Sequence, residues 1–315
     1  MPTRPSADVV VVGNGVLGLS VAVAVARRAP ALRVAVIGPP ERPGAASAAA
    51  GAMFNCFGEV TQYTARHPAA EAKFAIGRQA LDMWPQWLDM LTAAAGPEGD
   101  ALRASRVEGT FVVLGGRSGR VATRNFKAIR AALAEHDEPH EYVDPTDVEI
   151  DGLSPDLAAR PFHALYLPRE GAVDARRVLS ALEAACRRHN ITMAPHTVSR
   201  LSTGRGKMQG VHLSDGSRID TGTAVLAAGS QSAALAAPEL PPGAMPPLLH
   251  GTGLALVVEP PRPRPATSSV PRTGPRRAAC TRCPFPRADS STSVPPTSSP
   301  APRSPGPSSA PARAC

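Results

Sequence analysis

Cysteine and aromatic residues are scarce in this chain of 315 residues. Only 4% of the residues are aromatic, and the five cysteines do not form the disulfide framework that a small secreted protein needs. Cys280 and Cys283 make a single C-x-x-C pair, which supplies two of the four ligands that a structural zinc ion requires. We therefore expect no metal site.

A signal peptide or a membrane-spanning segment is not expected either. The apolar run at residues 9–26 is interrupted by three glycines and by Asn14. Asp8 precedes the run, where a signal peptide would carry only positive charge. The first part of the run is β-branched, which is typical of a buried strand. These features predict a cytoplasmic protein without a membrane partner.

The charge of the chain is unevenly distributed. The formal net charge is +8, but a disproportionate share of the positive charge lies after Glu259. The body of the chain is therefore closer to neutral. A face that binds nucleic acid needs clustered positive charge on a folded domain, so we predict no nucleic-acid partner.

Residues 8–37 have the pattern of a strand, a helix and a second strand. Residues 8–12 and 33–37 are valine-rich runs of the kind found in buried parallel strands. Residues 16–28 between them are apolar on all sides, which predicts a helix covered on both faces. The length of about thirty residues suits a right-handed crossover.

The turn of this unit is a G-x-G-x-x-G motif, Gly13-Asn14-Gly15-Val16-Leu17-Gly18. Gly13 makes the tight turn, Gly15 lets a pyrophosphate approach the backbone, and Gly18 lets the helix pack closely on the strand. Val16 and Leu17 open the helix, whose N-terminal N–H groups attract phosphate. The motif predicts a dinucleotide site but does not separate NAD from FAD.

The end of the second strand does not decide the cofactor. An acidic residue there usually binds the ribose hydroxyls, but this position is Gly38, followed by two prolines. Glu41 is the nearest carboxylate and a candidate for reaching back to the ribose. A solvated loop charge explains Glu41 equally well.

Residues 42–53 are a run of very small side chains that ends in Gly-Ala-Met. This run resembles a loop of the D-amino-acid oxidase and glycine oxidase-like flavoproteins, which passes the FAD pyrophosphate and begins the wall beside the isoalloxazine. Small residues suit it because the backbone lies against the cofactor. A flexible alanine-rich linker is the alternative. The FAD-binding residues that the resemblance implies here are Ala46, Ser47 (through its hydroxyl), Gly51, Ala52 and Met53.

Three later stretches resemble the same family in the same order. Residues 167–174, with the helix that follows, are similar to its "eG.vdp..l..al" segment, and residues 210–230 are similar to "gV.t.dG…vVlAaG". Val198 matches a position whose backbone meets the adenine in the family. Ala228 and Gly229 match a place where the backbone approaches FAD.

The resemblance implies an α/β fold. It predicts an FAD-binding Rossmann-like domain of the glutathione reductase type with an interleaved α+β substrate domain. The resemblance covers about residues 8–259. The expected FAD-binding segments are about 8–60 and 160–235, and the expected substrate-domain segments are about 61–159 and 240–259.

Periodicity predicts the other elements. Residues 71–91 are expected to form a helix in which Pro85 causes a kink or a new first turn. Asp174 is a good N-cap for a helix at residues 175–189. The further predictions are a helix at 126–136, strands at 106–114, 191–201, 209–213, 218–220, 223–228 and 251–258, and turns at 144–155 and 215–216.

The substrate side is less defined. Four residues after the small-residue run are candidates for the pocket, although core or loop roles explain them better: Phe54, Asn55, Glu59 and Tyr63. His250 is a weak catalytic candidate, because this region approaches the flavin in relatives. Some relatives attach flavin through His or Cys, but no matching His lies in the loop. Cys56 is expected to be a small buried residue, so we expect non-covalent FAD.

Residues 260–315 depart from the family. About a quarter of them are proline, and the composition alone predicts disorder. The family's final third normally supplies another flavin-contacting glycine segment and often an arginine for the substrate carboxylate, and neither is recognisable here. With permitted codons, a shifted frame can encode Leu-Tyr-Val-Gly-Ala-Thr-Asn at residues 290–297, which resembles the family's "lyvGat" strand. The tail is therefore either a frameshift product or a genuine disordered extension.

The resemblance implies FAD-dependent oxidation of the C–N bond of an amine or amino acid to an imine, with oxygen as acceptor. In such enzymes the flavin carries the chemistry, and the protein binds and orients it. Two alternatives stay open. One is a truncated or frameshifted, inactive flavoprotein, and the other is a different FAD-dependent dehydrogenase or monooxygenase of the same fold.

Overall fold

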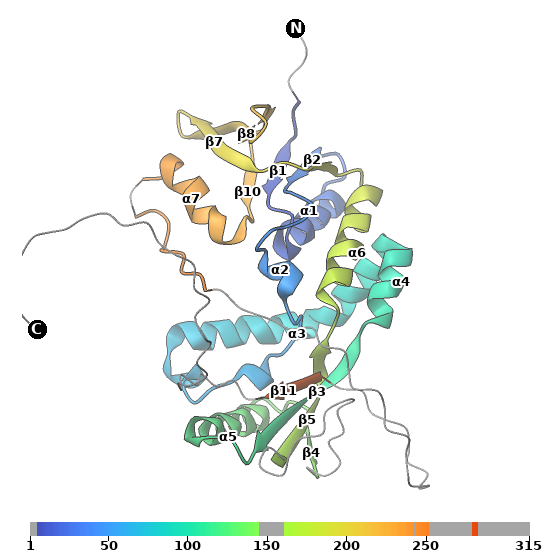
Figure 1. Ribbon diagram of the computed structural model, residues 1–315, viewed down its shortest axis with the longest axis vertical. Helices are drawn as coiled ribbons and strands as arrows, with labels where there is room; N and C mark the ends of the chain where they lie inside the picture. The colour runs from blue at the N-terminus through green and yellow to red at the C-terminus, as the bar shows by residue number, and fades with distance from the viewer. Residues whose placement is uncertain (1–4, 145–160, 242, 252–278, 283–315) are drawn as a thin grey trace, which may run out of the picture. The chain divides into compact units, whose positions relative to one another are not determined.

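The described residues of the computed structural model are 5–144, 161–241, 243–251 and 279–282. The chain divides into two units, Met1–Pro284 and Phe285–Cys315, and every described residue belongs to the first. This unit combines three β-sheets with packed helices (Figure 1). The predicted mixed α/β fold is confirmed.

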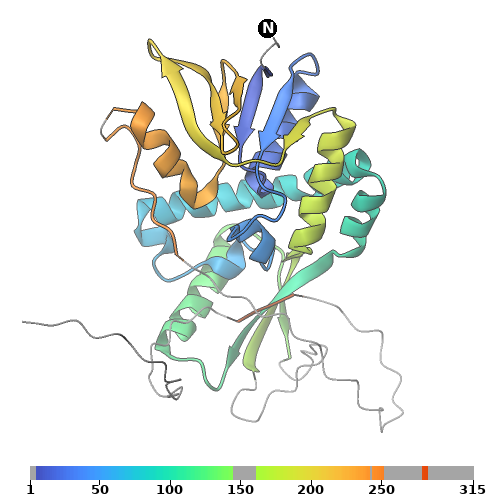
Figure 2. The same cartoon turned by 45° about the horizontal axis from the view of Figure 1, so that its top comes forward.

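The first sheet is parallel throughout, in the strand order β10-β1-β2-β6. Its strands are β1 (Val9–Val12), β2 (Val34–Ile37), β6 (Thr192–Ala194) and β10 (Ala224–Leu226). β1 and β2 lie side by side (Figure 2), and every residue of both is buried. On one face of β1, Val9 and Val11 pack in a core that is built mainly by helices, which we call the helical core. On the other face, Val10 and Val12 pack in a second core. The continuous valine run reflects this two-sided burial.

Helix α1 (Val16–Arg28) connects β1 to β2 and has the predicted bounds. Its buried face includes Leu19 and Val23, which pack in the helical core with β1 and β2. Leu17, however, is 72% exposed at the start of the helix. The prediction that both faces of this helix are covered is therefore wrong at its first turn.

Three further helices complete the helical core: α3 (Pro68–Ala95), α4 (Pro97–Ala104) and α6 (Ala175–Arg188). The Asp174 side chain accepts the backbone N–H groups of Arg176 and Arg177 at 2.8 and 3.2 Å, which confirms the predicted N-cap. Helix α3 continues through Pro85, so no new helix begins there. It supplies Leu88 and Leu91 to the helical core.

The second sheet has the order β11-β3-β5-β4. Its strands are β3 (Val107–Gly115), β4 (Glu141–Val143), β5 (Pro161–Ala172) and β11 (Ala279–Arg282). β5 pairs antiparallel with β3 and β4, and β11 pairs parallel with β3. β11 lies within the segment for which composition predicts disorder.

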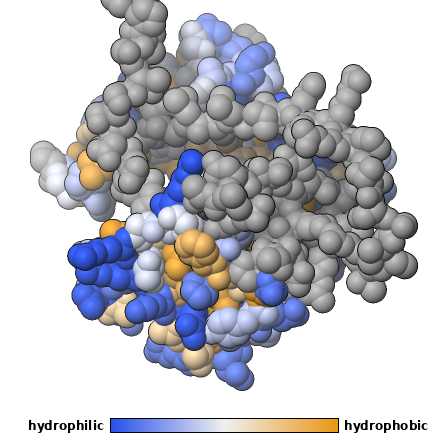
Figure 3. All heavy atoms as spheres, turned by 60° about the horizontal axis from the view of Figure 1, so that its bottom comes forward, coloured by the Kyte–Doolittle hydropathy of each residue, from blue (hydrophilic) through white to orange (hydrophobic). Residues whose placement is uncertain are grey.

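Helix α5 (Arg120–Glu135) covers this sheet and begins six residues before the predicted start at Phe126. Phe126, Ile129 and Leu133 pack with Leu165 of β5 in a separate core, to which α3 contributes Leu81. Helix α3 therefore supplies side chains to two cores. Figure 3 views the molecule from the α5 side, where the described surface is mostly hydrophilic around a smaller hydrophobic area.

The third sheet is an antiparallel meander of β7 (Val198–Gly204), β8 (Lys207–Leu213) and β9 (Arg218–Asp220). It packs on the parallel sheet through the second core. The single strand predicted for residues 191–201 is wrong, because β6 joins the parallel sheet while β7 joins the meander.

Short elements link these sheets: α2 (Ala46–Ala49), η1 (Phe57–Glu59), η2 (Thr64–Arg66), η5 (Gly229–Gln231), α7 (Ser232–Ala236) and η6 (Ala237–Glu239). The strand predicted at 251–258 and the turns at 144–155 fall almost entirely outside the described residues. Over the part of the chain that is described, no helix has the length and apolar character to span a bilayer.

Candidate cofactor site

The glycine turn between β1 and α1 tolerates no side chain at two positions. Gly13 has a φ of 113°, and a Cβ built on it would lie 2.3 Å from the carbonyl oxygen of Ala227. A Cβ built on Gly18 would lie 1.9 Å from the carbonyl oxygen of Gly13. Both distances are far inside van der Waals contact, so the turn and the close approach of α1 require glycine.

The N-terminus of α1 faces the small-residue run. The backbone N–H of Val16 donates a hydrogen bond to the Ser47 hydroxyl at 3.1 Å. A Cβ built on Gly15, the N-cap, would lie 3.1 Å from the same oxygen. Ser47 is thus brought to the helix N-terminus, where N–H groups and the helix dipole attract an anion. Leu17 is exposed beside them, and Ala46 is exposed in α2.

The Asn14 side chain contacts the residues that follow β2. Its buried side chain donates to the carbonyl oxygen of Pro39 at 2.9 Å. A Cβ built on Gly38 would lie 2.5 Å from the Asn14 side-chain oxygen. No side chain fits at Gly38 while Asn14 keeps this position, which explains why no acidic residue stands there. Glu41 is exposed on the loop that follows.

Arg42 ties this loop to two other elements, a role that sequence patterns did not indicate. Its Nε donates to the carbonyl oxygen of Asn14 at 2.8 Å, and its guanidinium forms an ion pair with Glu183 of α6. Arg42 adopts a φ of 48°, which is costly for a residue other than glycine. The side-chain contacts offset that cost and hold the loop against the glycine turn.

The end of the small-residue run is bound to the end of β5. The carbonyl oxygen of Ala52 accepts the N–H of Val173 at 3.1 Å, and the N–H of Phe54 donates to Gly171 at 3.0 Å. Met53 lies between them in an isolated bridge with Ala172. This backbone pairing positions the Gly-Ala-Met sequence against the end of β5.

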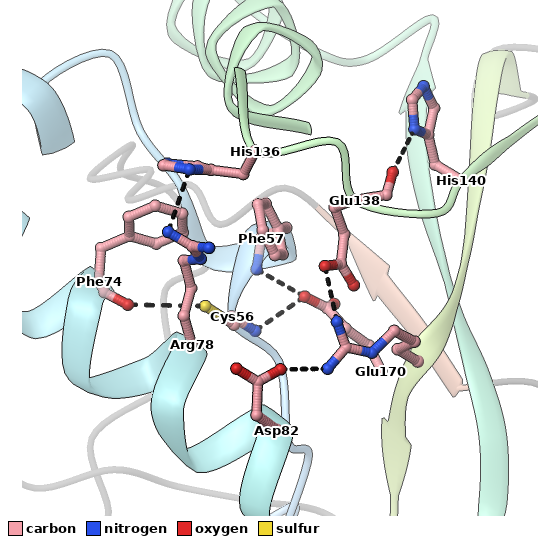
Figure 4. A network of polar contacts seen from close by, with 10 residues as sticks. Cys56, Phe57, Phe74, Arg78, Asp82, His136, Glu138, His140 and Glu170 are labelled. Carbon is pink, nitrogen blue, oxygen red and sulfur yellow. Dashed lines mark hydrogen bonds and ion pairs between the residues drawn. The ribbon is translucent and has the colours of Figure 1, made fainter. Parts of the chain in front are cut away.

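A buried carboxylate holds the next turn. Glu170 Oε1 accepts the backbone N–H groups of Cys56 and Phe57 at 2.8 and 2.6 Å (Figure 4). The same oxygen accepts the N–H group of Gly58 at 3.1 Å. Burial raises the pKa of the Glu170 carboxyl above its ordinary value, against the lowering effect of these three hydrogen bonds. The Glu138 carboxylate adds to the rise. Sequence reasoning placed Glu170 in a family motif but gave it no role.

The remaining candidates lie in different surroundings. Val198 is buried at the start of β7, where it packs in the second core with Val12 and Ala228. Gly229 is exposed with a φ of 56°. His250 is exposed.

The glycine turn, Gly38 and Gly229 follow β1, β2 and β10 respectively, so they share the carboxyl edge of the parallel sheet. Ligands of open parallel sheets bind at this edge. A Cβ built on Gly51 or Gly229 meets nothing within 4 Å, so both backbones are open to a ligand. A helix N-terminus, a hydroxyl and open backbone fit the pyrophosphate of a dinucleotide.

Residues 8–300 match the family of FAD-dependent oxidoreductases known as DAO. The chain belongs to this family. The matched region extends past Glu259, and it identifies FAD as the dinucleotide. No curated protein matches the chain.

Solved structures of other proteins have a similar fold. Glycine oxidase from Geobacillus kaustophilus has a TM-score of 0.59 and 20% identity, over 74% of this chain and 58% of that chain. L-amino acid deaminase from Proteus vulgaris has a TM-score of 0.55 and 16% identity, over 74% of this chain and 50% of the deaminase. A mutant of NikD, described as an unusual amino acid oxidase essential for nikkomycin biosynthesis, has a TM-score of 0.55 and 24% identity. The match covers 75% of this chain and 54% of the NikD chain. The chain thus spans little more than half of the glycine oxidase.

The four pocket candidates of this DAO member divide into packed and exposed residues. The Phe54 ring stacks on Trp84 with the centroids 5.0 Å apart, and the Asn55 side-chain oxygen accepts the Thr110 hydroxyl at 3.2 Å. Glu59 and Tyr63 are exposed. The first two therefore hold the loop in place.

Cys56 is buried, as predicted for a small core residue. Burial, with a smaller contribution from the Glu170 carboxylate, raises the pKa of its thiol to about 12. A thiol in this environment stays protonated at neutral pH and is a poor nucleophile.

Proposed function

We propose that this chain binds FAD without a covalent bond at the carboxyl edge of its parallel sheet, and that it oxidises the C–N bond of an amine or amino acid. Family membership supports the cofactor. The similarity to a glycine oxidase, an amino acid deaminase and an amino acid oxidase supports the substrate class.

One observation carries the assignment of the cofactor site. The Val16 N–H and the Ser47 hydroxyl meet beside Gly15, where an added side chain would be crowded. We infer that the pyrophosphate of FAD binds here, with Gly13 and Gly18 shaping the turn. The residues that we propose to line the rest of the FAD site are Val16, Leu17, Glu41, Ala46, Gly51, Ala52, Met53, Val198, Ala228 and Gly229.

When bound, FAD supplies the hydride acceptor for the carbon that carries the amine nitrogen. The chain's own residues bind and orient the cofactor. The protonated, buried Cys56 favours non-covalent attachment. Oxygen is the proposed final electron acceptor, and a small-molecule amine or amino acid is the proposed substrate.

A second candidate is a flavoprotein without turnover. It is favoured by the composition of residues 260–315, of which about a quarter are proline and in which the family's flavin-contacting glycine segment is not recognisable. A third candidate is another FAD-dependent dehydrogenase or monooxygenase, since one fold supports several flavin reactions.

Purification of the full chain separates these candidates. A yellow protein with flavin absorbance that releases peroxide with amino acids or amines supports the oxidase. Bound flavin with no turnover across an amine and amino-acid screen supports the second candidate, whereas flavin reduction by NADPH supports a monooxygenase. A chain that takes up no FAD overturns the proposed cofactor site.

A further inference from the structure

We propose that Glu170 is a positioning residue for the flavin segment, by which we mean residues 51–58. This inference rests on the proposed FAD site and deepens it. Its carboxyl holds the turn at Cys56–Gly58 in one conformation. This turn fixes the position of the Gly-Ala-Met backbone that precedes it.

The first support is the convergence of three consecutive N–H groups on one oxygen. Glu170 is 1% exposed, and Oε1 accepts all three hydrogen bonds from residues more than 110 positions earlier in the chain. The N–H groups of Cys56, Phe57 and Gly58 could not reach water in this buried position. Each would lose free energy if left without an acceptor. The carboxyl therefore determines the conformation of the turn.

The second support is that neighbouring residues of β5 hold successive pieces of the same segment. Gly171 and Val173 bind the backbones of Phe54 and Ala52, and Glu170 binds the turn that follows. A Cβ built on Gly171 would lie 2.2 Å from the Val107 carbonyl oxygen and 2.8 Å from the Phe54 ring. Glu170 thus supplies the hydrogen-bond acceptor for the turn, and the adjacent Gly171 lets the backbone of β5 lie close to Phe54.

The third support concerns the charges around Glu170. The nearby Arg169 guanidinium binds Asp82 of α3 and Glu138, the latter at 2.9 Å, and Arg78 pairs with His136 (Figure 4). Among the described residues, Oε2 of Glu170 has no hydrogen-bond partner, and a Cβ built on Gly58 would lie 3.0 Å from it. The carboxyl is thus held by the turn itself and not by an ion pair.

The test uses two variants at this site and one matched control in the full chain. Glu170→Gln keeps an acceptor oxygen but removes the charge, and Glu170→Ala removes the acceptor. Glu138→Gln is the control, because Glu138 is also a carboxylate of low exposure in the same network but contacts Arg169. Hydrogen exchange of residues 52–58 is measured without FAD, and FAD affinity and the visible circular dichroism of bound flavin are measured separately.

In Glu170→Ala we expect exchange at residues 56–58 to rise by about tenfold or more, because three buried N–H groups lose their acceptor. FAD affinity should fall by a similar factor, with an altered flavin circular dichroism that a uniform loss of stability does not produce. Glu170→Gln, which keeps an acceptor oxygen, should show smaller effects, and Glu138→Gln should resemble wild type at residues 52–58.

Unchanged exchange at residues 56–58 in Glu170→Ala would overturn the inference. So would faster exchange with unchanged FAD affinity and an unchanged flavin spectrum. If the wild-type chain takes up no FAD, the proposed function fails instead, and the exchange measurements alone decide whether Glu170 organises the segment.

Discussion

The hydroxyl of Ser47 accepts the backbone N–H of Val16 at 3.1 Å. This contact joins the N-terminus of α1 to a run of small residues that begins after β2, and it lies at the proposed pyrophosphate site.

Gly15→Val should abolish FAD binding, because the added branched side chain occupies the space between α1 and Ser47. Equilibrium dialysis or flavin absorbance after gel filtration measures the bound FAD. Gly222→Val is the control, since a Cβ built on Gly222 meets nothing within 4 Å. Stoichiometric FAD on Gly15→Val would contradict the placement of the pyrophosphate.

Ser47→Ala should weaken FAD binding by about tenfold or more, because a hydrogen bond to a charged group contributes about 1.5–3 kcal/mol. Titration with FAD measures the change. The free energy of unfolding without FAD should change by less than about 1.5 kcal/mol, since one part-buried neutral hydrogen bond is lost. Ser199→Ala removes a hydroxyl that binds the His212 carbonyl in the meander, and its FAD affinity should match wild type. Equal affinities for all three proteins would refute the role of Ser47.

Gly18→Ala should destabilise the fold even without FAD. The added methyl group would lie 1.9 Å from the Gly13 carbonyl oxygen, so α1 must move away from the turn. Overpacking of this kind costs about 1–3 kcal/mol. Urea unfolding of the variant, with Gly222→Ala as control, measures the loss. A midpoint equal to that of the control would show that the turn relaxes without cost.

Stability should depend on pH through Glu170. Burial raises the pKa of this carboxyl in the folded chain, so the folded state binds its proton more tightly than the unfolded state does. The stabilisation is complete below the unfolded pKa of about 4.3 and is lost as pH rises through the folded pKa. Burial raises the pKa of Glu138 in the same direction.

Unfolding free energies of wild type and Glu170→Gln between pH 4 and 8 test this dependence. The variant should lose stability less steeply than wild type as pH rises above about 4.3. Asp8 and Asp215 have lowered pKa values, so their contributions are lost only as pH falls below the ordinary aspartate range. Parallel curves for the two proteins would rule out titration of Glu170 in this window.

Local sequence patterns were enough for the strand, turn and helix of residues 8–37 and for the N-cap of α6. Their determinants lie close together in the chain: the Gly13 and Gly18 contact is five residues apart, and Asp174 caps the helix that follows it. Contacts between residues this close in the chain can be recognised from the local order of residue types. The resemblance of residues 42–53 to a flavoprotein loop then narrowed the dinucleotide to FAD, and the family match confirmed it.

Contacts between distant residues were decided only by the tertiary structure. The hydrogen bond between Glu170 and Cys56 spans 114 positions, and the contact between Arg42 and Glu183 spans 141. The split of residues 191–201 between two sheets and the continuation of α3 through Pro85 likewise depend on packing partners. A local pattern cannot specify these features, because the free energy that selects them comes from groups brought together by folding. The sequence alone thus determined a glycine-rich dinucleotide turn, whereas the fold decided which side chains hold the flavin segment beside it.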